Sequence, residues 1–250
     1  LETLAPTLLA GVPAIVKPAT ASCYVTELAV RIMLEADILP EGALQLVSGG
    51  LDDLLNRLTH QDMVSFTGSA ETALKLRAAP NILENSIRFI AEQDSLNASV
   101  LGPDAKPGTP EFDLFVKEVS REMTVKAGQK CTAIRRIVVP EPLVEPAIEA
   151  LLTALAKVTS GEPSNEATRM GALVSSEQKA DVLEKASIIG QDAERVIGDP
   201  QNFSVLGADA EAGAFVPPML FHCADPDQAE HVHTVEAFGP VSSIMPYRDV

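Results

Sequence analysis

The residue with the most evident chemistry is Cys131, in the segment "KAGQKCTAIRRIVVP" over 126–140. A cysteine thiolate attacks carbonyl carbon, and Lys126 and Lys130 beside it would favour the thiolate over the thiol. The pattern predicts that Cys131 lies in a turn between a helix over 111–127 and an apolar strand, and such turns carry function more often than the elements they join. The residues alone leave a second interpretation open, a small apolar group packed under the strand.

A second reactive side chain is Glu92, in "FIAEQDSLNASV". It follows an apolar strand where one lobe of the chain is expected to pass into the next, and clefts between lobes are common ligand sites. A partly buried carboxylate there can take a proton from water as a general base. A solvated glutamate at a strand end is the simpler interpretation. Asp94, expected on the same side of the strand, is a second candidate for the role.

Two further segments have the composition of cofactor-binding turns. "FTGSAETALKL" over 66–76 predicts a strand, a turn and a helix. The amides at the start of that helix, with Ser69, can bind a pyrophosphate, although the segment is not a GxGxxG motif. "VEAFGPV" over 235–241 places Glu236 and Phe238 in a turn that enters a strand, or is only an ordinary Gly-Pro turn.

No metal site is expected from the histidines and cysteines. His231 and His233 form an HxH pair with Glu236 nearby, but the further ligands of a zinc site are missing. Cys23, in a predicted helix, and Cys223, after an apolar strand, are expected to be structural. Three cysteines without CxxC spacing predict reduced thiols rather than a disulfide framework.

The elements that must position these residues alternate between short apolar strands and helices, which is typical of a parallel α/β sheet. The residues 1–91 predict one lobe, and the residues 92–250, with longer helices, predict a second. In the first lobe we expect strands over 12–18, 43–50 and 62–69, with helices over 1–11, 22–42 and 51–60. In the second we expect strands over 98–102, 133–140, 215–221 and 241–247, with helices over 110–128, 144–159 and 176–189.

Charge and composition exclude several classes of partner. The chain has 250 residues, 46% of them apolar, with 19 basic against 35 acidic residues and a formal net charge of -16. This charge would repel nucleic acid and anionic lipid. No stretch reaches the roughly 18–20 apolar residues of a membrane helix, and no secretory leader is recognisable. We therefore expect a cytoplasmic protein without a nucleic-acid or membrane partner.

Six segments, in chain order, resemble the aldehyde dehydrogenase superfamily. They are "AGVPAIVKPAT", "PEGALQLVSGG", "FTGS", the glutamate before the change of lobe, "GQKCTA" and "EAFGPV". The resemblance implies an α/β fold with part of a Rossmann-like cofactor lobe over 1–91 and a catalytic lobe over 92–250. It also implies that Cys131 is the nucleophile and Glu92 the general base in the oxidation of an aldehyde to a carboxylic acid.

The resemblance assigns cofactor contacts as well. Lys17 would contact the adenosine ribose, Ser69 the pyrophosphate, and Glu236 with Phe238 the nicotinamide ribose and ring. NAD-preferring members commonly carry a glutamate where this chain has Thr20. A neutral hydroxyl there favours NADP, with NAD possible, unless Thr20 only caps the helix that follows.

Departures from the family pattern indicate a particular group within the superfamily. The usual E-L-G-G-K-S block reads "EQDSLN" here, and Ala73 stands where a glycine is common. "DSLN" and "AGQKCTAIRRIVVP" are similar to the aldehyde dehydrogenase half of the bifunctional ring-opening proteins of phenylacetate breakdown. That similarity implies a small-molecule aldehyde as substrate, in the form of a semialdehyde linked to coenzyme A.

The resemblance also makes the chain an internal segment. The family's oxyanion asparagine is expected upstream of Leu1, and the tail used to form a homo-oligomer beyond Val250. Two other functions stay open at this point. One is an acylating dehydrogenase that passes the acyl group to coenzyme A, which a water-activating Glu92 argues against. The other is a nucleotide-binding module without turnover.

Overall fold

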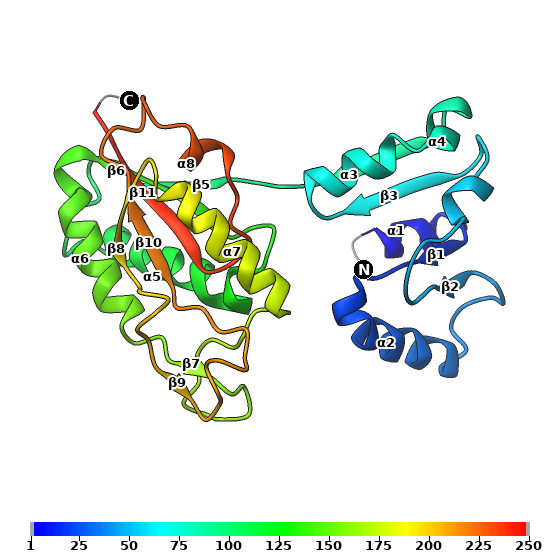
Figure 1. The fold of residues 1–250 in the computed structure, drawn as a ribbon, viewed down its shortest axis with the longest axis horizontal. Helices are drawn as coiled ribbons and strands as arrows, with labels where there is room; N and C mark the ends of the chain where they lie inside the picture. Colours follow the sequence, from blue (N-terminus) through cyan, green and yellow to red (C-terminus); the bar gives the residue numbers. More distant parts are fainter. Residues whose placement is uncertain (1–2, 249–250) are drawn as a thin grey trace. The chain divides into compact units, whose positions relative to one another are not determined.

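A computed structural model of the chain describes residues 3–248 and divides into two compact units, unit 1 (Leu1–Asp94) and unit 2 (Ser95–Val250). Both units combine helices with strands that are almost all parallel (Figure 1). The α/β class predicted from the sequence is confirmed.

Unit 1 contains two separate two-stranded parallel sheets. β1 (Ala14–Val16) pairs with β2 (Leu44–Leu46), and β3 (Met63–Thr67) pairs with β4 (Arg88–Glu92). The α-helices are α1 (Leu4–Leu9), α2 (Cys23–Glu35), α3 (Ala70–Arg77) and α4 (Pro80–Glu84), with 3₁₀ turns over Thr20–Ser22 and Leu54–Arg57. In Figure 1, α3 lies alongside β3.

The core of unit 1 is small. In its described part the buried apolar side chains are Val30, Leu44, Ala73, Ile82 and Ile87. Helix α2, by contrast, exposes Tyr24, Leu28 and Ile32. Since burial of apolar surface is the main stabilising term in folding, this unit obtains little of it from its own elements.

Two helices in unit 1 are shorter than the sequence predicts. The helix expected over 51–60 is only the 3₁₀ turn Leu54–Arg57, because the Asp62 carboxylate accepts from the amide and hydroxyl of Thr59 and closes a different turn. The helix expected over 22–42 ends at Glu35, and Asp37 after it has a left-handed backbone with φ 51°.

Unit 2 is built on a five-stranded sheet with the strand order β5-β6-β11-β10-β8. The strands are β5 (Asn97–Val100), β6 (Ile134–Pro140), β8 (Glu194–Ile197), β10 (Met219–His222) and β11 (Val241–Tyr247). All neighbours are parallel except β8, which is antiparallel to β10. A smaller parallel pair consists of β7 (Ser160–Gly161) and β9 (Val205–Leu206).

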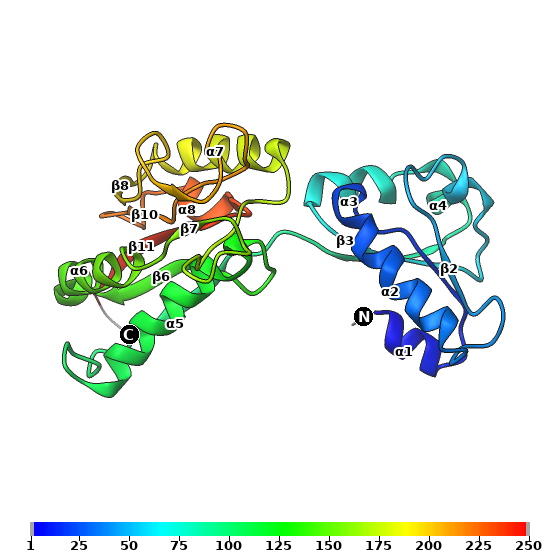
Figure 2. The ribbon, with the colours of Figure 1, turned by 90° about the horizontal axis from the view of Figure 1, so that it is seen from below.

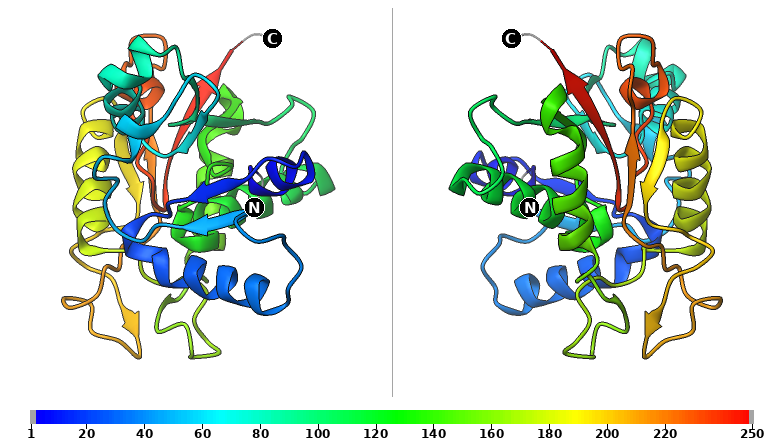
Figure 3. Two further views of the ribbon diagram at one scale, coloured as in Figure 1. Left: turned by 90° about the vertical axis from the view of Figure 1, so that its right-hand side faces the viewer. Right: turned by 90° about the vertical axis from the view of Figure 1, so that its left-hand side faces the viewer.

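Helices cover both faces of this sheet. α7 (Ser176–Ile189) lies on one side, and α5 (Pro110–Thr124) with α6 (Val144–Leu155) lies on the other, as Figures 2 and 3 show. Successive strand residues alternate between the two cores: Met219 and Phe221 pack on the α7 side, and Leu220 between them packs on the α5 and α6 side. A short helix, α8 (His231–Thr234), precedes β11.

Unit 2 also departs from the predicted elements. The strand expected over 215–221 is limited to β10, because Pro217 and Pro218 cannot donate ladder hydrogen bonds. The helix expected over 110–128 ends at Thr124, whose hydroxyl bonds back to the Ser120 carbonyl at 2.8 Å. The α6 helix ends at Leu155 rather than at 159.

Candidate active site

The turn that carries Cys131 has an unusual backbone. Lys126, Ala127 and Gly128 all have left-handed φ angles, of 55°, 52° and 69°. Such angles cost little in glycine but about 1 kcal/mol or more in other residues, so surrounding contacts must hold this turn in place. The prediction that a helix ends at Ala127 is therefore wrong. The segment is a tight reversal of the chain and not the last turn of a helix.

Gly128 lets this turn approach a second loop, the 236–240 loop. A Cβ atom at Gly128 would lie 2.2 Å from the Gly239 carbonyl oxygen and 2.8 Å from the Pro240 nitrogen. No side chain fits in that space. The two segments are thus in direct backbone contact, although they are far apart in the sequence.

Cys131 itself is exposed and its peptide carbonyl is held by two side chains. Ser95 Oγ donates to that carbonyl at 2.9 Å and Asn97 Nδ2 at 2.6 Å. Within residues 3–248 no group accepts a hydrogen bond from the Cys131 amide. An unbonded N–H beside a nucleophile can stabilise an oxyanion on the carbonyl that the nucleophile attacks.

Glu236 and Arg135 form a buried ion pair next to this turn. Their side chains are 8% and 4% exposed, and Arg135 Nε lies 3.3 Å from Glu236 Oε1. The second carboxylate oxygen of Glu236 accepts from the Ser95 amide at 3.0 Å. Burial lowers the pKa of the Arg135 guanidinium, and the charge and hydrogen bond of Glu236 oppose that effect.

Phe238 is half-buried in the same loop. The Arg135 guanidinium lies over its ring, 5.6 Å from the centroid, as a cation–π contact. Gln178 Nε2, from α7, donates to the Phe238 carbonyl at 3.1 Å. Cys131, Glu236 and Phe238, which the sequence predicts as site residues, therefore meet in one hydrogen-bonded assembly of unit 2.

The two lysines near Cys131, Lys126 and Lys130, differ in their surroundings. Lys130 Nζ forms a 2.6 Å ion pair with Glu122 of α5, which neutralises the charge that the sequence suggested for a thiolate. Lys126 is exposed. Cys223 is fully buried, and burial raises the pKa of its thiol, as suits a structural residue.

In unit 1, Glu92 and Ser69 lie at the ends of the paired strands β3 and β4. Glu92 is the last residue of β4, stands opposite Thr67 in the register, and is exposed. The Gly68 amide donates to the Glu92 carbonyl at 3.1 Å. Ser69 caps α3 by accepting from the Thr72 amide at 3.3 Å.

Asp94 differs from its expected place. It lies beyond β4 and its carboxylate accepts from the Ala70 amide, the first of α3, at 3.1 Å. Because Asp94 lies outside the strand, it is not a strand neighbour of Glu92 as predicted. It stands instead at the helix start where the sequence places a pyrophosphate.

The two residues expected at the adenosine ribose follow β1. Lys17 is half-buried and its Nζ donates to the Pro18 carbonyl at 3.1 Å. Thr20 is exposed and is the first residue of the 3₁₀ turn before α2. The Ncap position of α2 is Ser22, whose side chain makes no capping bond, so the alternative that Thr20 caps this helix is wrong.

These residues fit a dinucleotide in part. In unit 1, Ser69 and Lys17 carry donors of the kind that bind phosphate and ribose oxygens, but the first amide of α3 is already bonded to Asp94. In unit 2, Phe238 offers an aromatic ring. Glu236 fits less well, because both of its carboxylate oxygens are already bonded to Arg135 and Ser95.

No cluster of three or more His, Cys, Asp or Glu side chains with the geometry of a metal site occurs among the described residues. His233 Nε2 lies 3.0 Å from the Pro226 carbonyl oxygen. None of the helices described here has the length and apolarity to cross a membrane.

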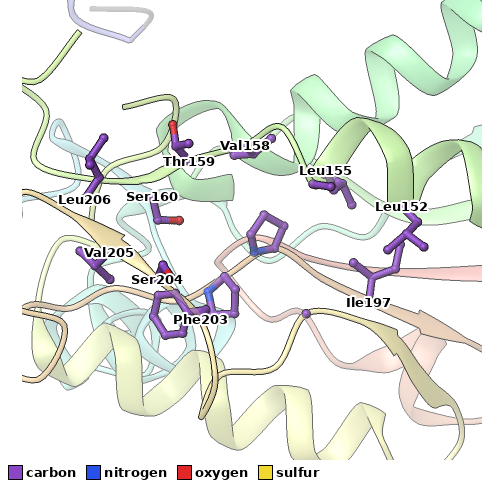
Figure 4. Close-up of a pocket in the computed structure, with 14 residues that line it drawn as sticks. Leu152, Leu155, Val158, Thr159, Ser160, Ile197, Phe203, Ser204, Val205 and Leu206 are labelled. Atoms are coloured by element: carbon purple, nitrogen blue, oxygen red, sulfur yellow. The ribbon is translucent and has the colours of Figure 1, made fainter. Parts of the chain in front are cut away.

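One pocket of unit 2 is separate from all of these groups. It has a volume of about 460 Å³ and lies between the end of α6 and the segment before β9 (Figure 4). Leu152, Leu155, Ile197, Phe203 and Val205 line it, and no predicted site residue does.

Sequence reasoning missed four residues of the assembly around Cys131, namely Ser95, Asn97, Arg135 and Gln178. "DSLN" was recognisable as a departure from the family block, but its hydrogen bonds to Cys131 were not. The double arginine "RR" at 135–136 was the available signal for Arg135, because one of two adjacent strand residues must point inward.

The comparison with family models decides the family. The whole chain, residues 1–250, matches the model described as "Aldehyde dehydrogenase family". The chain belongs to the aldehyde dehydrogenase family.

The sequence of this aldehyde dehydrogenase chain is similar to several characterised and putative family members. It is 49% identical over 248 residues to 3,4-dehydroadipyl-CoA semialdehyde dehydrogenase of Aromatoleum evansii, which covers 99% of this chain and 48% of that protein. It is 30% identical over 257 residues to a putative aldehyde dehydrogenase of Staphylococcus haemolyticus, with 99% and 50% covered. The chain thus spans about half the length of these relatives.

Solved structures show the aldehyde dehydrogenase fold. Betaine aldehyde dehydrogenase from Staphylococcus aureus, crystallised in complex with NAD+, superposes with a TM-score of 0.84 at 24% identity, covering 99% of this chain and 47% of that one. The predicted aldehyde dehydrogenase-like α/β fold is confirmed.

Proposed function

We propose that the protein containing this chain oxidises an aldehyde to a carboxylic acid with a nicotinamide dinucleotide as hydride acceptor. The observation that carries this proposal is Cys131, exposed, with an unbonded amide and a carbonyl fixed by Ser95 and Asn97, in a chain of the aldehyde dehydrogenase family.

In the proposed reaction the Cys131 thiolate adds to the aldehyde carbon and forms a thiohemiacetal. The oxyanion of this adduct accepts from the Cys131 amide. A bound nicotinamide dinucleotide would supply the acceptor for the hydride that leaves the adduct carbon as the thioester forms. Glu92 takes a proton from water, and the hydroxide attacks the thioester, releasing the carboxylic acid and the free thiolate.

The dinucleotide is proposed to bind through Lys17 and Ser69, with Phe238 against the nicotinamide ring. We propose NADP as the preferred form. Thr20 is exposed and free of a capping role, and a hydroxyl does not repel a 2′-phosphate as a carboxylate would. NAD is the second form that this site would accept.

The substrate is proposed to be a semialdehyde linked to coenzyme A, formed during phenylacetate breakdown. The similarity to a 3,4-dehydroadipyl-CoA semialdehyde dehydrogenase supports the substrate class. The protein is expected to act in the cytoplasm as a homo-oligomer, without nucleic acid or membrane as a partner.

The test is aldehyde-dependent reduction of NADP by the full-length protein, with adipyl-CoA semialdehyde and free adipic semialdehyde as probes. Cys131→Ala should lower the rate by at least about 10³-fold and leave the fold intact, because it removes one small exposed thiol. Cys23→Ala is the matched control and should retain the parent's rate.

Two results would count against the proposal. A Cys131→Ala protein that keeps more than about one hundredth of the parent's rate would place the nucleophile elsewhere. A parent that binds NADP yet is inert with both probes would leave only the nucleotide-binding module without turnover.

A further inference from the structure

We propose that Arg135 is a positioning residue for the reaction, which fixes the Cys131 turn and the 236–240 loop as one rigid assembly. This inference rests on the proposed function, because it assigns to Arg135 the placement of the nucleophile relative to the groups that face the nicotinamide. Arg135 is not among the site residues predicted from the sequence.

All three nitrogens of the Arg135 guanidinium are used. Nη2 donates to the Gly128 carbonyl at 2.8 Å, and Nη1 donates to the Gly239 carbonyl at 2.5 Å. Nε faces the Glu236 carboxylate. One side chain thus joins the turn before Cys131 to both ends of the loop that carries Phe238.

A second route joins the same parts through Ser95. Its amide donates to Glu236 and its hydroxyl donates to the Cys131 carbonyl. Together with Arg135 and Gly128 this makes a closed circuit of hydrogen bonds that begins and ends at the nucleophile's turn. A displacement of the 236–240 loop must therefore displace Cys131.

The burial of the ion pair between Arg135 and Glu236 indicates that the circuit of hydrogen bonds belongs to the folded core. Taking a guanidinium and a carboxylate out of water is costly unless they are paired and hydrogen-bonded, and here all three guanidinium nitrogens and both carboxylate oxygens have a partner. Because Glu236 has both oxygens occupied, it supports the loop from within. The Arg135 cation lies over one face of the Phe238 ring and restricts its orientation.

The neighbouring arginine has a different role. Arg136 points to the other face of β6 and donates through Nε and Nη2 to the Leu96 carbonyl, at 3.0 and 2.7 Å. It therefore cannot take over the contacts of Arg135. Arg121, exposed on α5 in an ion pair with Glu118, is a suitable surface control.

The experiment compares Arg135→Lys, Arg135→Gln and Arg121→Lys in the full-length protein. Lysine keeps the charge but has one nitrogen, which cannot reach two carbonyls and a carboxylate together. We expect Arg135→Lys to raise the KM for NADP and to lower kcat, each by roughly tenfold or more. Arg121→Lys should change neither.

Two readouts do not depend on turnover. They are NADPH binding, followed by its fluorescence, and the rate at which iodoacetamide alkylates Cys131. Arg135→Lys should weaken NADPH binding and shift the alkylation rate by severalfold at an unchanged melting temperature, as loss of structural stability alone would not. If Arg135→Gln fails to fold, Arg135→Lys decides the question.

The inference is overturned if Arg135→Lys is folded and all four quantities stay within about twofold of the parent. If this happens while the parent protein is active, the proposed function still holds. If the parent protein is inactive, the proposed function is wrong, and the NADPH-binding and alkylation measurements still decide the role of Arg135.

Discussion

The two units support their site residues in different ways. In unit 2, Cys131 lies on a turn that is held by side chains from β5 and β6 and by direct backbone contact with the 236–240 loop. In unit 1, Glu92, Ser69 and Lys17 each lie at the end of a strand that has a single partner. The buried core is also very unequal, since most of it belongs to unit 2.

This contrast indicates a division of labour. The proposed nucleophile must be held within fractions of an ångström to react, and unit 2 surrounds it with a layered core and a closed hydrogen-bond circuit. The proposed base and cofactor contacts are on a unit that is stabilised less by its own packing. Substitutions should therefore affect chemistry in both units but stability mainly in unit 2.

The largest expected effect tests whether unit 1 takes part in the chemistry at all. Glu92→Gln should lower steady-state turnover by about 10²–10⁴-fold, because the amide keeps the shape and loses the basicity. Acylation and hydride transfer should survive as a single burst of about one reduced cofactor per active site. Stopped-flow absorbance measures both phases.

Asp94→Asn is the comparison for that experiment, since Asp94 is the second candidate for the general base. If Glu92→Gln turns over normally and Asp94→Asn does not, the base is Asp94. Unit 1 would then still supply the general base, but from Asp94 and not from Glu92.

Much of the fold and part of the site could be predicted from the sequence, for local reasons. Strand and helix alternation predicted the α/β class, and the segment around Cys131 predicted a turn before a strand. The pairing of Arg135 with Glu236 could not be predicted, because the two residues are 101 positions apart and meet only when β6 and β11 pair. The reversal at Lys126 was equally hidden, since tertiary contacts override the propensity of lysine and alanine for helix.

The second prediction compares how much the buried cores of the two units contribute to the free energy of unfolding. Leu151→Ala should destabilise the protein by about 2–5 kcal/mol, because Leu151 is fully buried beneath the sheet. Leu28→Ala on α2, where the side chain is 53% exposed, should cost less than about 0.5 kcal/mol. Urea unfolding of the full-length protein gives both values. A cost for Leu28→Ala close to that of Leu151→Ala would mean that the exposed face of α2 is covered in the full-length protein.

The smallest expected effect concerns cofactor preference in unit 1. Thr20→Glu should raise the KM for NADP by roughly tenfold and the KM for NAD much less, because a carboxylate repels the 2′-phosphate and accepts from a 2′-hydroxyl. Initial rates with the two cofactors give the ratio. Thr20→Val is the control for loss of the hydroxyl alone. Equal effects on both cofactors would remove Thr20 from the ribose site.

The separation of 101 positions between Arg135 and Glu236 also has a consequence for the order of events during synthesis. Until the ribosome has passed Pro240, the Gly128 turn lacks its contact with the 236–240 loop and β6 lacks its neighbour β11. The assembly thus depends on contacts of large sequence separation, which form late and slowly in folding. A nascent chain that stops before this point has only the contacts of Ser95 and Asn97 to hold the Cys131 carbonyl, and the support of the 236–240 loop is added when β11 pairs with β6.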